Sequence, residues 1–170
     1  MDAKFSPKVK EVISFSREEA LRLGHNFIGI EHILLGLIRE SDSNAVKILR
    51  RLEVDVDQLR KTVENGMEPA SAIQPTDKDK ITLVKQAEKM LKITFLEAKV
   101  FKSQQIETEH LLLSILKDDD NLATRTLNKM QVDYETVKHE VDTIKADSPK
   151  PERPKASGAT DDDDDDGGAR

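Results

Sequence analysis

The sequence of 170 residues has no cysteine and no tryptophan, and its aromatic residues are five phenylalanines and one tyrosine. Without cysteine, the chain cannot form disulfides, use a thiolate as a nucleophile or bind a metal through sulfur. No apolar run approaches the roughly 18 residues of a membrane-spanning helix, and the N-terminus Met1–Phe5 lacks the apolar stretch of a secretory signal. These absences predict a cytoplasmic protein.

Several catalytic signatures are also missing from the sequence. It has no Gly-x-Ser-x-Gly elbow for a serine nucleophile and no His-Glu-x-x-His zinc helix. The Gly-x-x-x-x-Gly-Lys-Ser/Thr loop that cradles nucleotide phosphates is absent too. We therefore expect that this chain is not an enzyme, does not hydrolyse ATP by itself and needs no cofactor.

Charge is abundant in the sequence. Charged residues make up 35% of the chain and hydrophobic residues 36%, which is typical of a soluble helical protein with a core of Leu, Ile, Val and Ala. The formal net charge is −6, and the run Asp161–Asp166 carries six negative charges, so the remainder is close to neutral. Bulk charge therefore indicates neither nucleic acid nor an anionic membrane as a partner. We interpret the aspartate run as a solvated spacer.

An internal duplication is the most informative feature of the chain. Residues 27–39 read FIGIEHILLGLIR and residues 105–117 read QIETEHLLLSILK, at an offset of 109 − 31 = 78 residues. A duplicated unit of about 75 residues predicts two lobes related by a pseudo-twofold axis. The same offset, without gaps, pairs further identical residues: Glu19 with Glu97, Ala20 with Ala98, Ala45 with Ala123, Leu49 with Leu127, Val54 with Val132, and Asp55 with Asp133.

Local signals divide each copy into four helices. Ser6, Ser43, Asp55 and Asp133 are residue types that begin helices, because their side-chain oxygens accept a hydrogen bond from an unpaired backbone N–H. Pro7 follows Ser6 at the first helical position, which proline favours. Apolar spacing then predicts helices at about 7–24, 30–39, 43–52 and 55–66 in the first copy, and at about 83–98, 109–116, 122–130 and 133–145 in the second.

The predicted fold class is all-α, with two tandem four-helix repeats related by pseudo-twofold symmetry. We expect one domain over residues 1–146, with repeat one at about 3–66, a linker at 67–79 and repeat two at about 80–145. Residues 147–170 are rich in Ser, Pro, Gly and Asp and have no apolar periodicity, which predicts a disordered acidic tail. Such a tail is typical of a tether toward a further module.

Two Glu-His pairs, Glu31-His32 and Glu109-His110, stand at the starts of predicted helices. For the histidines we favour a structural role in the preceding loop. A glutamate in a first helical turn stabilises the helix dipole, but an exposed carboxylate repeated by symmetry also suits a ligand that carries a cation and an anion. Metal binding is weakly indicated, because adjacent residues project about 100° apart on a helix.

The motifs EEALRLGHN at 18–26, IGIEHILLGL at 28–37 and TEHLL at 108–112 resemble the double-repeat Clp N-terminal domain. The resemblance covers about residues 3–145 and is strongest to the ClpC type. It implies a monomeric, eight-helix domain joined by a flexible linker to two ATPase modules that lie outside this sequence. It also implies partners: the domain receives adaptor and substrate proteins above a hexameric ring. The complete protein uses ATP and magnesium to thread unfolded chains into the ClpP peptidase.

Relatives of the ClpC type can recognise phosphorylated arginine as a degradation mark. The resemblance implies that the glutamate of each Glu-His pair binds the guanidinium, while residues near the start of the first helix bind the phosphate. In the first copy Glu31 and Ser6 fit that pattern, because a carboxylate pairs with a guanidinium and a helix start receives a phosphate. Ser6 and Glu31 are therefore the expected first site.

The second copy departs from this pattern. Glu109 is present, but Val84 stands at the position of the serine, and Thr82 lies nearby as a substitute. The loop after the first helix also differs, since it reads Phe101-Lys102 in the region that corresponds to Gly24-His25. We therefore expect two related sites that are not equivalent.

Two other classes of protein fit parts of the sequence. The chain could be a standalone Clp-repeat adaptor or protein-binding module that ends near Arg170, and an ATPase module continuous with it would decide against this. A small metalloenzyme that uses the Glu-His pairs would require stoichiometric zinc. We favour a substrate- and adaptor-docking domain of a ClpC-type unfoldase, with candidate binding residues Ser6, Glu31, Glu109 and Thr82.

Overall fold

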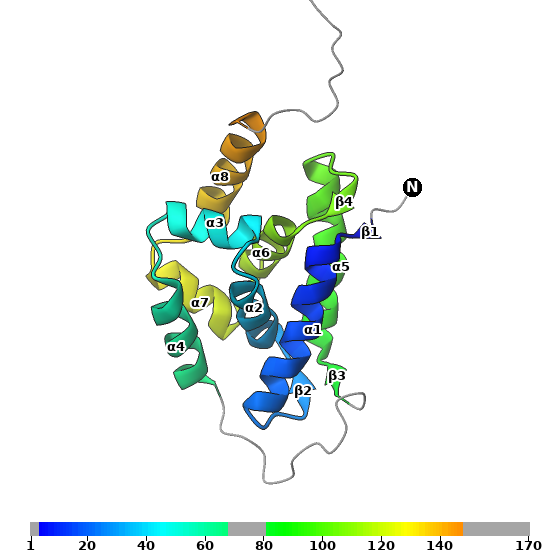
Figure 1. Ribbon diagram of the computed structural model, residues 1–170, viewed down its shortest axis with the longest axis vertical. Helices are drawn as coiled ribbons and strands as arrows, with labels where there is room; N and C mark the ends of the chain where they lie inside the picture. The colour runs from blue at the N-terminus through cyan, green and yellow to red at the C-terminus, as the bar shows by residue number, and fades with distance from the viewer. Residues whose placement is uncertain (1–3, 68–80, 148–170) are drawn as a thin grey trace, which may run out of the picture.

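The computed structural model describes residues 4–67 and 81–147, and this part of the chain contains eight helices. The expected linker at 67–79 and the expected disordered tail at 147–170 lie, apart from their first residues, outside the described residues. The all-α prediction is confirmed, and the elements are shown in Figure 1. The helices are α1 Pro7–Arg22, α2 Ile30–Arg39, α3 Asn44–Arg51, α4 Val56–Gly66, α5 Lys85–Val100, α6 Thr108–Leu116, α7 Leu122–Lys129 and α8 Tyr134–Asp147.

The four predicted helix caps are confirmed. Ser6, Ser43, Asp55 and Asp133 each accept a hydrogen bond from the backbone N–H three residues further along, at 2.8–3.2 Å. Val84 occupies the position before α5 that Ser6 occupies before α1, and it provides no side-chain cap. The two copies therefore begin their first helices at equivalent positions with different chemistry.

Four strands of two residues were not predicted: β1 Lys4–Phe5, β2 Phe27–Ile28, β3 Thr82–Leu83 and β4 Gln105–Ile106. β1 pairs in parallel with β4, and β2 pairs in parallel with β3. Each pair therefore joins one repeat to the other, at opposite ends of the domain in Figure 1. Leu83 was expected in a helix but lies in β3, because its backbone hydrogen-bonds across to the other repeat, which apolar spacing does not reveal.

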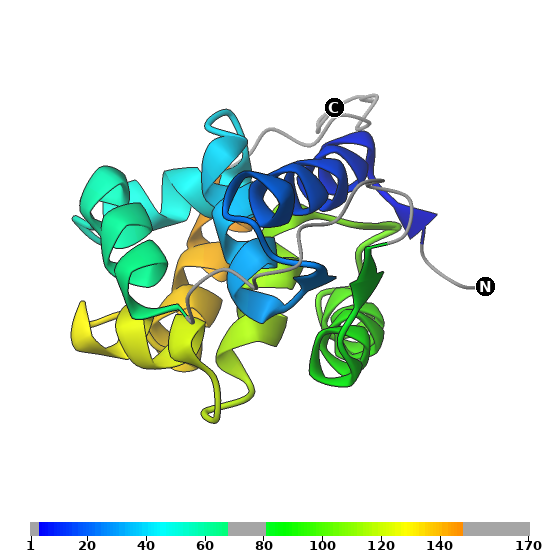
Figure 2. The same cartoon turned by 90° about the horizontal axis from the view of Figure 1, so that it is seen from below.

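Helices α2 and α6 form the centre of the fold. Both are apolar around most of their circumference, as expected for helices surrounded by protein. The view along the long axis shows α2 enclosed by the other helices, with α5 at the edge (Figure 2). Leu35 is 1% exposed and Leu113 fully buried, which confirms that this equivalent pair belongs to the core.

The ends of α1 and α5 correct one detail of the sequence alignment. Gly24 and Lys102 both have a left-handed backbone, with φ of 79° and 54°. The residue after each donates its N–H to the carbonyl five positions earlier, His25 to Ala20 and Ser103 to Ala98. Lys102 is therefore the counterpart of Gly24, and Ser103 is the counterpart of His25. The expected match of Phe101-Lys102 to Gly24-His25 was displaced by one residue.

The contact between α1 and α2 requires a glycine. A Cβ added at Gly36 would lie 2.6 Å from the Val12 carbonyl oxygen and 2.8 Å from the Ser16 backbone nitrogen. In repeat two the equivalent position is Ser114, whose hydroxyl donates to the Met90 carbonyl at 2.5 Å. The first helix pair is thus packed backbone to backbone, while the second accommodates a small hydroxyl.

Candidate functional site

The two histidines of the Glu-His pairs are structural. His32 is fully buried, and its Nδ1 accepts the Gly29 N–H at 2.9 Å. Its Nε2 must then carry the proton, and it lies 2.8 Å from Nδ1 of His25. Burial, together with the neighbouring His25, lowers the pKa of His32 to about 4. His110 repeats the arrangement, because its Nδ1 accepts the Glu107 N–H at 2.8 Å.

A metal site is not formed by these pairs. Within residues 4–67 and 81–147, no group of three or more His, Asp or Glu side chains is placed to hold a metal ion. His32 directs both ring nitrogens at protein groups, so neither is available as a ligand. The metalloenzyme alternative therefore has no support from the described structure.

The two glutamates connect the repeats crosswise. Glu31 Oε2 accepts the backbone N–H of Leu122, the first residue of α7, at 3.2 Å. Glu109 Oε2 accepts from the side-chain amide of Asn44, the first residue of α3, at 3.4 Å. Thr108 Oγ1 accepts the neighbouring Ala45 N–H at 3.2 Å. Both carboxylates are therefore half-buried at the start of a helix from the other repeat, rather than freely exposed as expected.

Glu109 is left with unused hydrogen-bonding capacity. Its Oε1 is buried and accepts no hydrogen bond from any residue that the structure describes. Burial raises the pKa of the Glu109 carboxyl above its ordinary value, and its own backbone N–H and Asn44 offset this only in part. A buried carboxylate oxygen without a donor is energetically costly, which makes this position a candidate for an external cation.

A cavity of about 220 Å³ opens beside Glu109. Its walls come from both repeats and combine one carboxylate and one ammonium group with apolar side chains. The apolar part suits the aliphatic stem of a long side chain, and the two charges suit a cation and an anion. The lining residues are Asn44, Ile48, Phe101, Lys102, Ser103, Glu109, His110, Val141 and Ile144.

A second cavity, of about 310 Å³, lies beside Glu31 and is related to the first by the 78-residue offset. His25, Glu31, Gly66 and Leu122 replace Ser103, Glu109, Ile144 and Asn44. Arg125 also lines this cavity, so a cation from the protein itself faces the space around Glu31. The two cavities are related but not equivalent.

Ser6 and Thr82 do not join these sites in the expected way. The Ser6 N–H donates to the Ile106 carbonyl, so the start of α1 lies beside repeat two and not beside Glu31. Thr82 pairs with Phe27 in the β2–β3 ladder, so the start of α5 lies beside repeat one. Neither residue lines either cavity. The Ser6 side chain is also buried and already engaged as the cap of α1.

Lys102 and Asn44 are site residues that the sequence did not identify. Asn44 belongs to the other repeat and reaches Glu109 across a separation of 65 residues. Lys102 had been noted only as a departure from Gly24-His25. The sequence does hold one signal for Lys102, because this residue follows the first helix of the second copy at the position where the first copy has Gly24.

Known proteins share this sequence pattern. The profile of the Clp repeat (R) N-terminal domain matches residues 4–100 and residues 82–162. The chain is 34% identical over 145 residues to the chaperone protein ClpB of Oceanobacillus iheyensis. It is also 34% identical over 145 residues to the negative regulator of genetic competence ClpC/MecB of Bacillus subtilis. Each alignment covers 83% of this chain and 17% of the relative, so the chain spans about a sixth of their length.

Solved structures share the fold. The N-domain of ClpV from Vibrio cholerae superposes with a TM-score of 0.71 at 15% identity, covering 85% of this chain and 87% of that one. The N-terminal domain of ClpD from Arabidopsis thaliana gives 0.64 at 18% identity, covering 82% and 95%. A complex of the ClpV N-domain with a VipB peptide gives 0.69 at 18% identity, covering 85% and 89%. None of the helices in the described ranges is long and apolar enough to cross a membrane.

Proposed function

This chain belongs to the Clp repeat N-terminal domain family, and from that premise we propose that it is the docking domain of a ClpC-type ATP-dependent unfoldase. In this role it binds adaptor and substrate proteins in the cytoplasm. ATP and magnesium act in modules outside this chain, within a hexamer that delivers unfolded chains to the ClpP peptidase. A solved structure of the ClpV N-domain, which has the same fold, is a complex with a VipB peptide, and this supports a docking role.

The observation that carries the proposal is the cavity at Glu109. A carboxylate with one buried oxygen that has no hydrogen-bond donor destabilises the free domain, and a bound cation would remove that penalty. A guanidinium is the side-chain cation best shaped to pair with a carboxylate, because it presents parallel N–H groups. An arginine side chain of a partner therefore fits this cavity, with its aliphatic stem against Ile48 and Val141.

Phosphorylated arginine is the form of the ligand that we propose. Its guanidinium pairs with Glu109, and its phosphate is received by the ammonium group of Lys102, which lines the same cavity. We therefore assign the phosphate contact to Lys102 and not to Ser6, because Lys102 lines the cavity and Ser6 does not. The cavity at Glu31 is the weaker site, since Glu31 already caps α7 and Arg125 lies in the same cavity.

The test distinguishes the contribution of the phosphate from the contribution of the guanidinium. Binding of free phosphoarginine and of free arginine is measured by residue-resolved NMR on the wild-type chain and on Lys102→Asn. Asparagine tolerates the left-handed backbone at this position, so the loop should be preserved. We expect Lys102→Asn to weaken phosphoarginine at least about tenfold and arginine less than about twofold. Equal losses for both ligands would contradict the role of Lys102.

A further inference from the structure

The outward face of α5 carries a row of lysines that ends in two exposed apolar side chains. The first five members, from Lys85 to Lys99, are separated by three or four residues, and Val100 follows Leu96 by four, so all of them lie along one side of the helix. Leu96 is 58% exposed and Val100 is 59% exposed, and they are the large hydrophobic residues most open to solvent within the described ranges. The α5 face consists of Lys85, Lys89, Lys92, Leu96, Lys99 and Val100.

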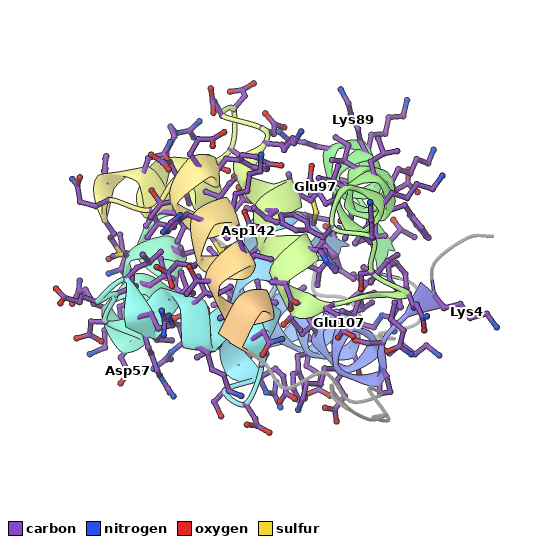
Figure 3. All side chains as sticks on the ribbon, turned by 90° about the horizontal axis from the view of Figure 1, so that it is seen from above. Lys4, Asp57, Lys89, Glu97, Glu107 and Asp142 are labelled. Atoms are coloured by element: carbon purple, nitrogen blue, oxygen red, sulfur yellow. The ribbon has the colours of Figure 1, made fainter. Side chains whose placement is uncertain are left out.

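The opposite side of α5 shows how the helix is anchored. Glu97 is buried and binds Lys117 at 3.2 Å and the Tyr134 hydroxyl at 2.7 Å. In Figure 3, Glu97 points toward the rest of the domain, while Lys89 points away from it. Figure 2 places α5 at the edge of the helix assembly, so nothing in the described structure covers the α5 face.

Most lysines of this face have no ion-pair partner among the described residues, although Lys89 interacts electrostatically with Asp118. Lys85, Lys92 and Lys99 form no ion pair with any residue in the described ranges, and all three are exposed. A row of like charges on one side of a helix repels itself, which disfavours the isolated helix. Only Lys99, in the last turn of α5, is placed where a cation favours the helix dipole, so the charges of Lys85 and Lys92 are not explained by the fold.

The pseudo-twofold partner of α5 shows that the fold does not require this face. At the equivalent positions of α1 stand Glu11, Ser14, Glu18 and Arg22 in place of Lys89, Lys92, Leu96 and Val100. Glu18 and Arg22 are used within repeat one, in ion pairs with Arg39 and Glu19. The same scaffold thus folds with polar, internally paired residues where α5 has lysine and exposed apolar side chains.

We propose that the α5 face docks an acidic segment of a partner protein that carries an apolar side chain at one end. The carboxylates of the segment pair with the lysine row, and its apolar side chain packs on Leu96 and Val100. Nucleic acid is disfavoured, because the chain as a whole has a net charge of −6 and the two apolar residues offer nothing to a phosphate backbone. The α5 face shares no residue with the Glu109 cavity, so the two sites can be tested separately.

The probe is a fluorescein-labelled peptide with six carboxylates followed by a leucine and a phenylalanine. Its binding to the full chain is followed by fluorescence anisotropy. The first variant is Lys92→Glu/Lys99→Glu, and the second is Leu96→Ser/Val100→Ser. The matched control, Lys47→Glu/Lys61→Glu, changes the net charge by the same amount at exposed lysines of α3 and α4 that form no ion pair within the described ranges.

We expect the first variant to weaken binding at least about tenfold and the second at least about threefold, with less than twofold for the control. Glu109→Gln should leave this binding unchanged, which separates the α5 face from the phosphoarginine site. An equal loss in the charge-matched control, or no loss in Leu96→Ser/Val100→Ser, would overturn the proposal. Equally tight binding of anionic vesicles or of duplex DNA through the same lysines would also overturn it.

Discussion

Replacing Glu109 by glutamine should stabilise the domain at neutral pH. The amide preserves the shape of the side chain and can still accept from Asn44, so the main change is the loss of a buried negative charge. The amide also leaves a polar atom without a partner at the position of Oε1, but an unpaired charged group costs more than the roughly 1–3 kcal/mol of a neutral one, so the substitution recovers that difference. The carboxylate recovers about 0.3–1 kcal/mol from the dipole at the start of α6. The difference predicts a gain of about 1 kcal/mol in the free energy of unfolding.

Glu31→Gln is the matched control, because the same substitution there has the opposite expected sign. Glu31 accepts the N–H of Leu122, and a charged acceptor stabilises such a bond by roughly 1 kcal/mol more than a neutral one. Urea unfolding followed by circular dichroism at pH 7 measures both variants against the wild type. The reasoning is refuted if Glu109→Gln destabilises the domain as much as Glu31→Gln does.

The pH dependence gives a second check on the same prediction. Because the folded-state pKa of Glu109 is raised, the folded domain binds this proton more tightly than the unfolded chain does. The destabilising effect of the charge is therefore absent below the ordinary glutamate pKa near 4.5 and fully present above the raised value. The advantage of Glu109→Gln should shrink as the pH falls from 7 toward 4.5.

Three further predictions concern the fold. Gly36→Ala should lower the free energy of unfolding by about 1–3 kcal/mol, because the added Cβ would collide with backbone atoms of α1. Ser114→Ala should cost less, since it only removes a hydrogen bond, and thermal unfolding of the two variants measures the difference. The pKa of His32 is lowered to about 4, so the stability that depends on its neutral form is complete above pH 6.5 and is lost as the pH falls toward 4. In urea unfolding, His32→Asn should remove on the order of 3 kcal/mol of pH dependence from the free energy of unfolding over that window. Leu35→Ala and Leu113→Ala should each cost about 2–5 kcal/mol in urea unfolding, and unchanged midpoints would contradict their core position.

The helices could be predicted because their signals are local. Each cap, such as Ser43 or Asp133, acts on a backbone N–H only three residues away, and the apolar spacing of each helix is read within a short window. The duplication also predicted that the two copies are equivalent, and the structure adds a pair of left-handed residues at the same offset, Glu53 and Gln131, that the sequence did not identify. The helix caps and apolar spacing depend only on neighbouring residues, and the equivalence of the copies follows from comparing the two halves of the sequence.

The candidate site was predicted less completely, because it is assembled from both repeats. The sequence identified Glu31 and Glu109, but it grouped each with residues of its own repeat. In the structure the strand pairs join the repeats, so the start of α1 lies beside Ile106 and the start of α3 lies beside Glu109. A pairing of two residues per strand leaves too short a pattern for any periodicity to detect.

The most direct test of the account is an NMR titration of the chain with free phosphoarginine, carried out on the wild type, Glu109→Gln and Glu31→Gln. We predict shifts centred on Lys102, Ser103 and Glu109, a loss of binding of at least about tenfold in Glu109→Gln and a smaller loss in Glu31→Gln. Glutamine at 109 should at the same time stabilise the domain, so lost binding cannot be attributed to unfolding. Undiminished binding by Glu109→Gln would contradict the assignment of this cavity as the docking site.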